Sequence, residues 1–128
     1  MTTISDIFGI HERALRVRND RLEVIATNIA NGDTPRFKAR DIDFRKVLGS
    51  VVQESLKTTD QQHFPTPPDA LPANGLSYRV PFNAPGDGNT VEMSVEQAQY
   101  GRAAADYRAS LMFIENRASG IKRALRGE

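Results

Sequence analysis

Few side chains in this sequence are suited to catalysis, and they stand far apart. The histidines are His11 and His63, and catalysis with a histidine base also needs a nucleophile and an orienting acid beside it. His11 falls in a helical pattern and His63 in a polar run, so we interpret them as a surface or packing residue and a loop hydrogen-bonding residue. The absence of cysteine excludes disulfides, thiol nucleophiles and Cys-ligated zinc. We therefore expect no catalytic residue and no enzyme.

Two acidic stretches resemble fragments of metal sites. Asp41 and Asp43 form a DxD pair, but Arg40 and Arg45 flank them and no third ligand stands out. The run 86–89 (Gly-Asp-Gly-Asn) lacks the alternating acids and the terminal Glu of a calcium-binding EF-hand. We interpret the pair as salt-bridge partners and the run as a turn, and we expect no metal and no other cofactor.

The most informative polar residues surround the end of the first predicted helix. Asn28 and Asn31 lie in its last turn, where their amides can hydrogen-bond the following loop, and Thr34 can do so from the other side. Pro35 favours an extended exit, and Phe37 can fold back as an apolar plug. These five residues predict a helix-cap and loop motif that sets an angle between helix and loop and performs no chemistry.

Two long helices are predicted to position this motif. The N-terminal segment, 1–31, reads as a helix from about residue 5, with apolar residues seven apart and one between them. Asn31 and Gly32 end it, because Gly readily adopts the left-handed conformation that follows a last helical turn. The apolar residues that we expect to pack are Leu15, Leu22, Ile25 and Ile29, in line with Phe8.

The C-terminal segment, 94–128, carries a sustained heptad pattern, which is typical of a coiled-coil seam. Ser94 and Gln97 are predicted to form a capping box at its start, and Lys122, Arg123 and Arg126 suit the negative end of its dipole. A helix over 94–125 is roughly 48 Å long at 1.5 Å per residue. The seam consists of Tyr100, Ala104, Tyr107, Leu111, Ile114, Ala118, Ile121 and Leu125.

The chain between the helices divides into two parts. Segment 32–56 is predicted to be a capped rigid loop followed by a short helix over 45–56. Segment 57–93 holds six of the seven prolines and reads as irregular, with a strand from Leu76 to Val80 and a possible β-hairpin about Asn74-Gly75. The predicted fold is mainly α: an antiparallel coiled-coil domain of the two terminal helices, with an irregular Pro/Gly-rich middle.

Charge and hydropathy narrow the class of protein. A formal charge of +1 argues against a nucleic-acid binder, no apolar run reaches the ~18 residues of a membrane span, and no secretory signal opens the chain. A two-helix hairpin leaves its outer faces exposed, so we infer lateral association through the apolar seams. The arginines of the first helix alternate with acids, which is typical of a solvated face or of ion pairs between subunits: Arg13, Arg16, Arg18 and Arg21.

The combination of motifs resembles one known family. Asn28-x-Ala-Asn31, then Thr34-Pro35 and the aromatic Phe37, is similar to the signature of bacterial flagellar rod and hook proteins. The run 38–44 (Lys-Ala-Arg-Asp-Ile-Asp-Phe) narrows the likeness to proximal-rod proteins, and the stretches 78–81 and 87–93 agree with it. One departure is Arg36, where the wider family often has Gly before the aromatic residue.

The resemblance implies a structural subunit. Proteins of this family pack their terminal helices as a coiled-coil inner domain around an export channel and are exported through the flagellar type III apparatus without a cleaved signal. They assemble in the periplasm on the membrane-embedded ring, beside the adaptor protein FliE, other rod proteins and other copies of themselves, and they take no small-molecule substrate. For this chain we expect subunit packing through Leu15, Leu22, Ile25, Ile29, Tyr107, Leu111, Ile114, Ile121 and Leu125. The alternative is a soluble coiled-coil adaptor or export chaperone.

Overall fold

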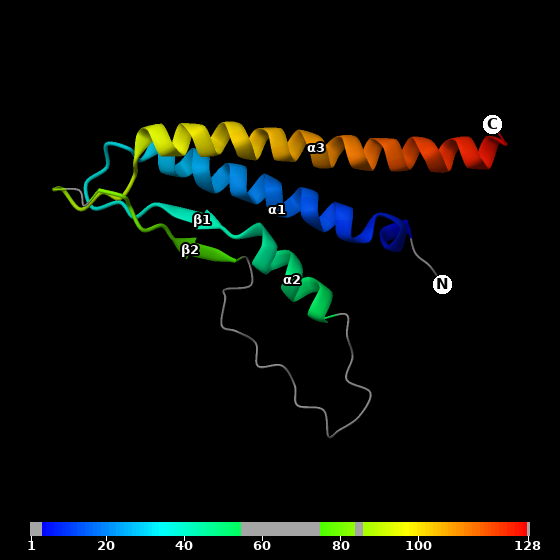
Figure 1. Ribbon diagram of the computed structural model, residues 1–128, viewed down its shortest axis with the longest axis horizontal. Helices are drawn as coiled ribbons and strands as arrows, with labels where there is room; N and C mark the ends of the chain where they lie inside the picture. Colours follow the sequence, from blue (N-terminus) through cyan, green and yellow to red (C-terminus); the bar gives the residue numbers. More distant parts are fainter. Residues whose placement is uncertain (1–3, 55–74, 84–85, 128) are drawn as a thin grey trace, which may run out of the picture.

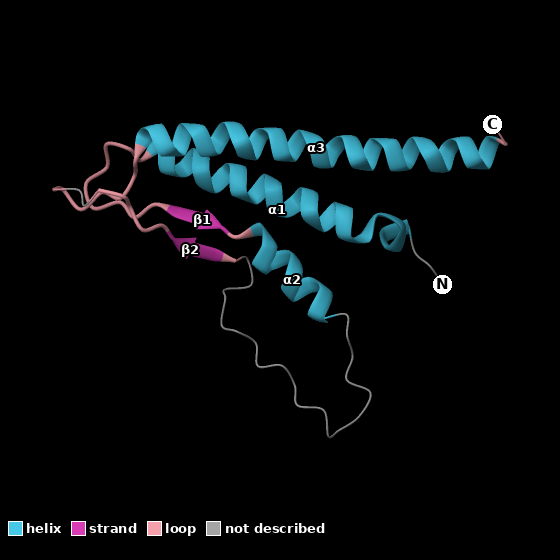
Figure 2. Ribbon diagram, viewed as in Figure 1, coloured by secondary structure: helices cyan, strands magenta, loops and turns pink. Residues whose placement is uncertain are grey.

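The computed structural model describes residues 4–54, 75–83 and 86–127. Within them the element order is helix α1 (Ile4–Ala30), strand β1 (Arg40–Ile42), helix α2 (Phe44–Glu54), strand β2 (Leu76–Tyr78) and helix α3 (Met93–Arg126). The two long terminal helices and the mainly helical fold are as the sequence predicts (Figures 1 and 2). In these residues no helix is both long enough and apolar enough to cross a membrane.

Helix α1 is the central element of the molecule. It packs against α3, β1 and α2, and it runs in the opposite direction to α3, so that α1 begins and α3 ends at the same end of the molecule (Figure 1). The loops that join the elements gather at the other end. The buried apolar side chains are few, namely Ile25, Ala39, Ile42 and Ala103. All four lie on or beside the half of the hairpin that carries the loops.

The backbone of α1 leaves helical geometry at Gly9 (φ 15°, ψ −99°). A sharp change of direction inside a helix has an identifiable cause, and here glycine tolerates a conformation that other residues avoid. The apolar pattern of the sequence is also least regular at this point, where His11 interrupts it. The regular part of α1 therefore begins after Gly9.

The predicted capping box at the start of α3 is wrong. The helix begins one residue earlier, Glu92 is the N-cap residue, and no side chain caps the helix. The Glu92 carboxylate instead accepts hydrogen bonds from the backbone N–H groups of Phe82 (3.1 Å) and Asn83 (3.4 Å). Its Oε atoms are thus used to hold the chain that follows β2 against the start of α3. At the other end, Gly127 takes the left-handed conformation (φ 74°) that commonly ends a helix.

The strand predicted at Leu76 is present, and the hairpin suggested about Asn74-Gly75 falls partly outside the described residues. The strand pairs antiparallel with β1, with Ile42 opposite Leu76 and Arg40 opposite Tyr78. The Arg79 N–H extends the ladder to the Ala39 carbonyl (2.9 Å). The sequence did not predict β1 because it lies within a loop dominated by charged residues. Positions 72–74 lie outside the described residues.

Helix α2 is confirmed over the described part of the range predicted for it. The Asp43 carboxylate accepts hydrogen bonds from the N–H groups of Arg45 (3.0 Å) and Lys46 (3.2 Å), so it caps the helix. The helix continues through Gly49 and Ser50. Residues 55 and 56 of the predicted range lie outside the described residues.

The two apolar seams are occupied to different extents. On α1, Ile25 is fully buried and Leu15, Leu22 and Ile29 are half-buried. In the first turns of α3 the buried side chains are Glu96 and Ala103, while Tyr100, at the start of the predicted seam, is 42% exposed within the single chain. The apolar pattern did not indicate Glu96, a charged residue whose side chain is fully buried. Farther along α3, Tyr107, Ile114 and Ile121 are half-buried, whereas Leu111 is 36% and Leu125 83% exposed.

Candidate functional site

The candidate site is the junction where the end of α1, the start of α3 and the small sheet meet. Asn28 lies at its centre and is buried. Its Nδ2 donates to the Arg40 carbonyl (2.7 Å) and to Glu96 Oε2 (3.1 Å), and its Oδ1 accepts from the Arg40 N–H (3.1 Å). The side chain therefore pairs with the backbone of β1 as a neighbouring strand would, and it joins three elements.

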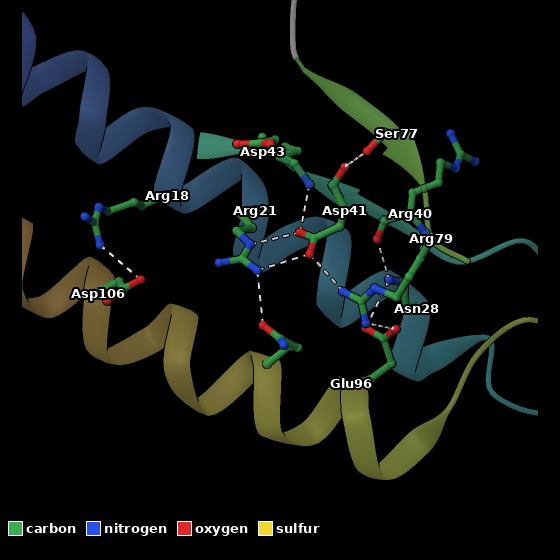
Figure 3. A network of polar contacts seen from close by, with 12 residues as sticks. Arg18, Arg21, Asn28, Arg40, Asp41, Asp43, Ser77, Arg79, Glu96 and Asp106 are labelled. Carbon is green, nitrogen blue, oxygen red and sulfur yellow. Dashed lines mark hydrogen bonds and ion pairs between the residues drawn. The ribbon is translucent and has the colours of Figure 1, made fainter. Parts of the chain in front are cut away.

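An ion-pair chain crosses the same junction (Figure 3). Glu96, whose side chain is fully buried, pairs with Arg79 (2.6 Å). Arg79 also pairs with Asp41 (2.9 Å), and Asp41 accepts a second, two-atom contact from Arg21 (2.9 and 3.1 Å). Arg21 reaches α3 as well, through Gln99 (3.2 Å). We call these residues, together with Asn28, the ionic junction.

Electrostatics favours the charged forms in the ionic junction. Burial alone would raise the pKa of Asp41, but the hydrogen bonds and positive charge of Arg21, the Ile42 N–H and a hydrogen bond from Arg79 outweigh it, so the pKa lies below its ordinary value of 3.8. The hydrogen bond to Asp41 in turn raises the pKa of Arg21. The junction is thus a charge-compensated connection, which rigidly fixes the elements it joins.

Within the predicted helix-cap and loop motif, only some of the five side chains contact one another or the loop. Asn31 Nδ2 donates back to the Thr27 carbonyl (2.8 Å), and the Thr34 hydroxyl donates to Asn31 Oδ1 (3.1 Å). Phe37 is half-buried and its carbonyl accepts from the Thr90 N–H (2.9 Å). Pro35 is exposed. The remaining member of the motif, Asn28, belongs to the ionic junction.

Asn89 is the residue that sequence reasoning missed. Its Nδ2 lies within hydrogen-bonding distance of three loop carbonyls, those of Asn31 (3.1 Å), Gly32 (2.7 Å) and Thr34 (3.0 Å), and its Oδ1 accepts from the Val91 N–H (2.8 Å). It is 5% exposed. The sequence indicated only a turn at this position. The burial of Asn89 depends on carbonyls of the loop at 31–34, more than fifty residues away in the sequence, so no local pattern could have indicated it.

The acidic residues considered as metal ligands have structural roles. Asp41 belongs to the ionic junction and Asp43 caps α2. Among the described residues, no group of three His, Asp or Glu side chains could hold a metal ion. His11 is half-buried on α1, and His63 lies outside the described residues. The described arrangement joins helices and loops through hydrogen bonds and ion pairs.

Large apolar side chains remain exposed on two surfaces. On α3, Met112 is 61% and Phe113 65% exposed, next to the partly exposed Leu111. At and after β2, Val80 and Phe82 are each 86% and Tyr78 71% exposed. Concentrations of exposed apolar side chains mark sites of protein–protein interaction. A helical hairpin with large apolar side chains exposed on two surfaces is typical of a protein that assembles with other chains.

Comparison with known proteins identifies the class of assembly. Residues 8–38, which comprise most of α1 and the loop up to Lys38, match the family described as flagella basal body rod protein. The chain is similar to the flagellar basal body rod protein FlgB of Aeromonas hydrophila, with 44% identity over 94% of this chain and 93% of the relative.

Two further relatives carry the same name. The FlgB protein of Cereibacter sphaeroides strain ATCC 17029 is 40% identical over the whole length of both chains, and that of Escherichia coli K12 is 38% identical over 89% of this chain and 88% of its own. The chain therefore belongs to the FlgB family of flagellar basal body rod proteins.

Proposed function

We propose that this chain is a structural subunit of the proximal rod of the flagellar basal body, and that its terminal helices pack as an antiparallel coiled-coil layer into the wall of a hollow tube. The tube surrounds the export channel and transmits torque. Membership of the FlgB family supports the rod function. The packing is supported by the length of α3 and by the apolar side chains that α1 leaves uncovered on it.

The exposure of Met112 and Phe113 is the observation that carries this proposal. Met112 is 61% and Phe113 65% exposed, and both lie on one turn of the helix. A neighbouring subunit that covers them removes their apolar surface from water. Burial contributes about 25 cal/mol for each Å² of apolar surface removed from water. When such lateral contacts repeat along a 34-residue helix, small subunits can associate side by side into the wall of a tube.

The ionic junction suits the transmission of torque. It joins α1, β1, α3 and the residue after β2 through buried or half-buried ion pairs. Such pairs resist bending because displacing one partner leaves an uncompensated buried charge. The angle between the hairpin and its loops is consequently fixed within each subunit.

The partners follow from this placement. We propose that the chain contacts other copies of itself and other rod proteins, and that the adaptor FliE and the membrane-embedded ring lie at the base of the tube. Delivery through the flagellar type III export apparatus is part of the same proposal. Neither nucleic acid nor a small-molecule substrate has a place in this function, and the chain acts without catalysis.

Fractionation tests the function against the alternative of a soluble adaptor or export chaperone. A tagged copy of the chain, produced in flagellated cells that lack their own protein of this type, should restore swimming and remain in detergent-resistant basal bodies. Recovery of the tagged chain only in the soluble fraction, with motility restored, would instead identify an adaptor or chaperone.

A further inference from the structure

A shallow groove lies between α1 and the small sheet. It has a volume of about 330 Å³, and Val24, Phe37, Ile42 and Leu76 contribute its apolar lining. Asp20 and Glu23 line it from α1, and both are exposed. No ion pair of Asp20 or Glu23 occurs within residues 4–54, 75–83 and 86–127, although Glu23 accepts a hydrogen bond from Asn19. We call this feature the acidic groove.

Among the described residues, Arg40 is the one positively charged side chain in the lining of the acidic groove. Its guanidinium lies over the ring of Tyr78, 5.9 Å from the ring centre, on the sheet side. The α1 side of the groove is therefore negative and the sheet side is not. A complementary occupant carries apolar residues for the floor and cations that lie toward α1.

The last turns of α3 have this chemistry. Leu125 is 83% exposed, and at helical spacing Ile121 lies on the same side of the helix. Lys122 and Arg126 stand one turn apart beside that apolar row, and neither has an ion pair among the described residues. These residues, 121–126, have no acidic member.

The two features lie toward opposite ends of one molecule. The groove is formed by the sheet and the second half of α1, whereas the last turns of α3 lie at the other end of the molecule and extend past the beginning of α1 (Figure 1). One chain cannot insert its own helix end into its own groove. A contact between two different surfaces of identical subunits is heterologous, and when it does not close into a ring it produces a helical filament.

Resting on the rod function proposed above, we propose that residues 121–126 of a second copy dock into the acidic groove, with Leu125 on the apolar lining and Lys122 and Arg126 facing Asp20 and Glu23. This contact is axial and joins copies end to end, whereas the seams of the terminal helices join them side by side. It follows the helix-in-groove mode of recognition, in which an amphipathic helix places its apolar face in a hydrophobic groove.

Disulfide trapping tests this contact directly, because the chain has no cysteine of its own. Two differently tagged full-length chains, Thr27→Cys at the groove and Ala124→Cys near the helix end, are produced together in flagellated cells, and basal bodies are isolated and oxidised. We expect a disulfide between the two tags at least tenfold above that of a control pair, Ala105→Cys with Ala124→Cys. Ala105 is an exposed residue of α3 outside the groove.

Charge reversal shows whether the rim acids carry the contact. Adding Asp20→Lys and Glu23→Lys to the groove chain should lower trapping about tenfold, which corresponds to roughly 1.4 kcal/mol. Adding Lys122→Glu and Arg126→Glu to the other chain should restore it, because complementary charges again face each other.

The outcomes separate the two proposals. Basal bodies that contain both tagged chains without the expected disulfide, or a disulfide to a different rod protein, overturn docking of a second copy and leave the rod function standing. Trapping that ignores the charge reversals also overturns it. Basal bodies that lack both tagged chains contradict the rod function, and the docking fails with it.

Discussion

Glu96 and Asp41 are carboxylates held among arginines in a region that water reaches only partly. Glu96 is fully buried and contacts Arg79 and Asn28, while the side chain of Asp41 is 22% exposed and contacts Arg21 and Arg79. Each arginine thus has a carboxylate partner, and Arg79 has two. Removing one member leaves the others desolvated and incompletely paired.

Replacing Glu96 should destabilise the chain strongly. Glu96→Ala leaves Arg79 with Asp41 alone and removes one of the two acceptors of the Asn28 amide, so we expect a loss of about 3 kcal/mol in the free energy of unfolding. Glu96→Gln, which retains the shape and an acceptor oxygen, should lose less. Urea denaturation followed by circular dichroism measures both, and equal stability of the wild type and Glu96→Ala would contradict the structural role of the junction.

Acid should weaken the fold through Asp41. Its pKa is lowered in the folded chain from 3.8, so the folded state binds the proton less readily than the unfolded state. The stabilisation is fully present above the unfolded value and is lost as pH falls below about 4 through the folded pKa. Thermal melting between pH 7 and pH 2 should show this loss, and Asp41→Asn should be less stable at pH 7 with a weaker dependence on pH in the acid range.

Asn89 is the corresponding test of the loop. Asn89→Ala removes the amide that contacts three carbonyls and the oxygen that accepts from Val91, so buried backbone groups lose their partners at roughly 1–3 kcal/mol. We expect a lower melting temperature with the helix content of the folded chain unchanged. Asn83→Ala, at an exposed position, is the matched control and should melt as the wild type does.

At the scale of elements, the loop after α1 contains a strained residue. Arg36 has φ 63°, the left-handed conformation that costs residues other than Gly roughly 1 kcal/mol or more. Arg36 stands where the wider family often has Gly, and its positive φ is a conformation that favours Gly. The Arg36 N–H donates to the Asp87 carbonyl (3.3 Å), which ties this turn to the loop that contains Asn89.

Substitution at Arg36 should separate conformation from contact. Arg36→Gly should keep or slightly raise stability, because relief of the strain is partly offset by the greater entropy of Gly in the unfolded chain. Arg36→Val, a β-branched residue for which positive φ is a true outlier, should lower the melting temperature by several degrees. Differential scanning calorimetry compares the two, and a Val variant as stable as the Gly variant would show that the turn adapts.

What the sequence could predict at this scale depended on local signals. Both long helices and α2 follow from apolar periodicity, and Gly32 indicates where the first helix ends. Strand β1 could not be predicted, because its partner lies more than thirty residues away and its own residues are mostly charged. The arginines of α1 looked like a solvated or intersubunit face, yet Arg21 pairs within the chain with Asp41. A pattern of apolar residues predicts which apolar side chains are buried. It cannot predict that the polar side chains of Glu96 and Asn89 are buried as well.

At the scale of the whole molecule, stability and assembly use different residues. The fully buried side chains gather where α1, the sheet and the first half of α3 meet, and beyond Ala103 no described residue of α3 is buried. The second half of α3 therefore contributes less to folding the single chain. In the proposed rod its apolar residues contact neighbouring subunits, and we expect helicity of the isolated chain to rise on self-association in sedimentation and circular dichroism measurements.

Leu111 and Ile114 distinguish the two uses. Leu111 is 36% exposed in the single chain, so Leu111→Asp keeps its charge in contact with water there and should change the melting temperature of the monomer little. In the rod wall the same carboxylate is covered by a neighbour and unpaired, at a cost of several kcal/mol, so incorporation into basal bodies and swimming should be lost. Ile114→Asp, at a half-buried position, should also lose incorporation, together with some monomer stability. Leu111→Met preserves volume and hydrophobicity and should assemble normally. Normal motility of the Leu111→Asp variant would mean that this face of α3 stays open to water in the finished rod.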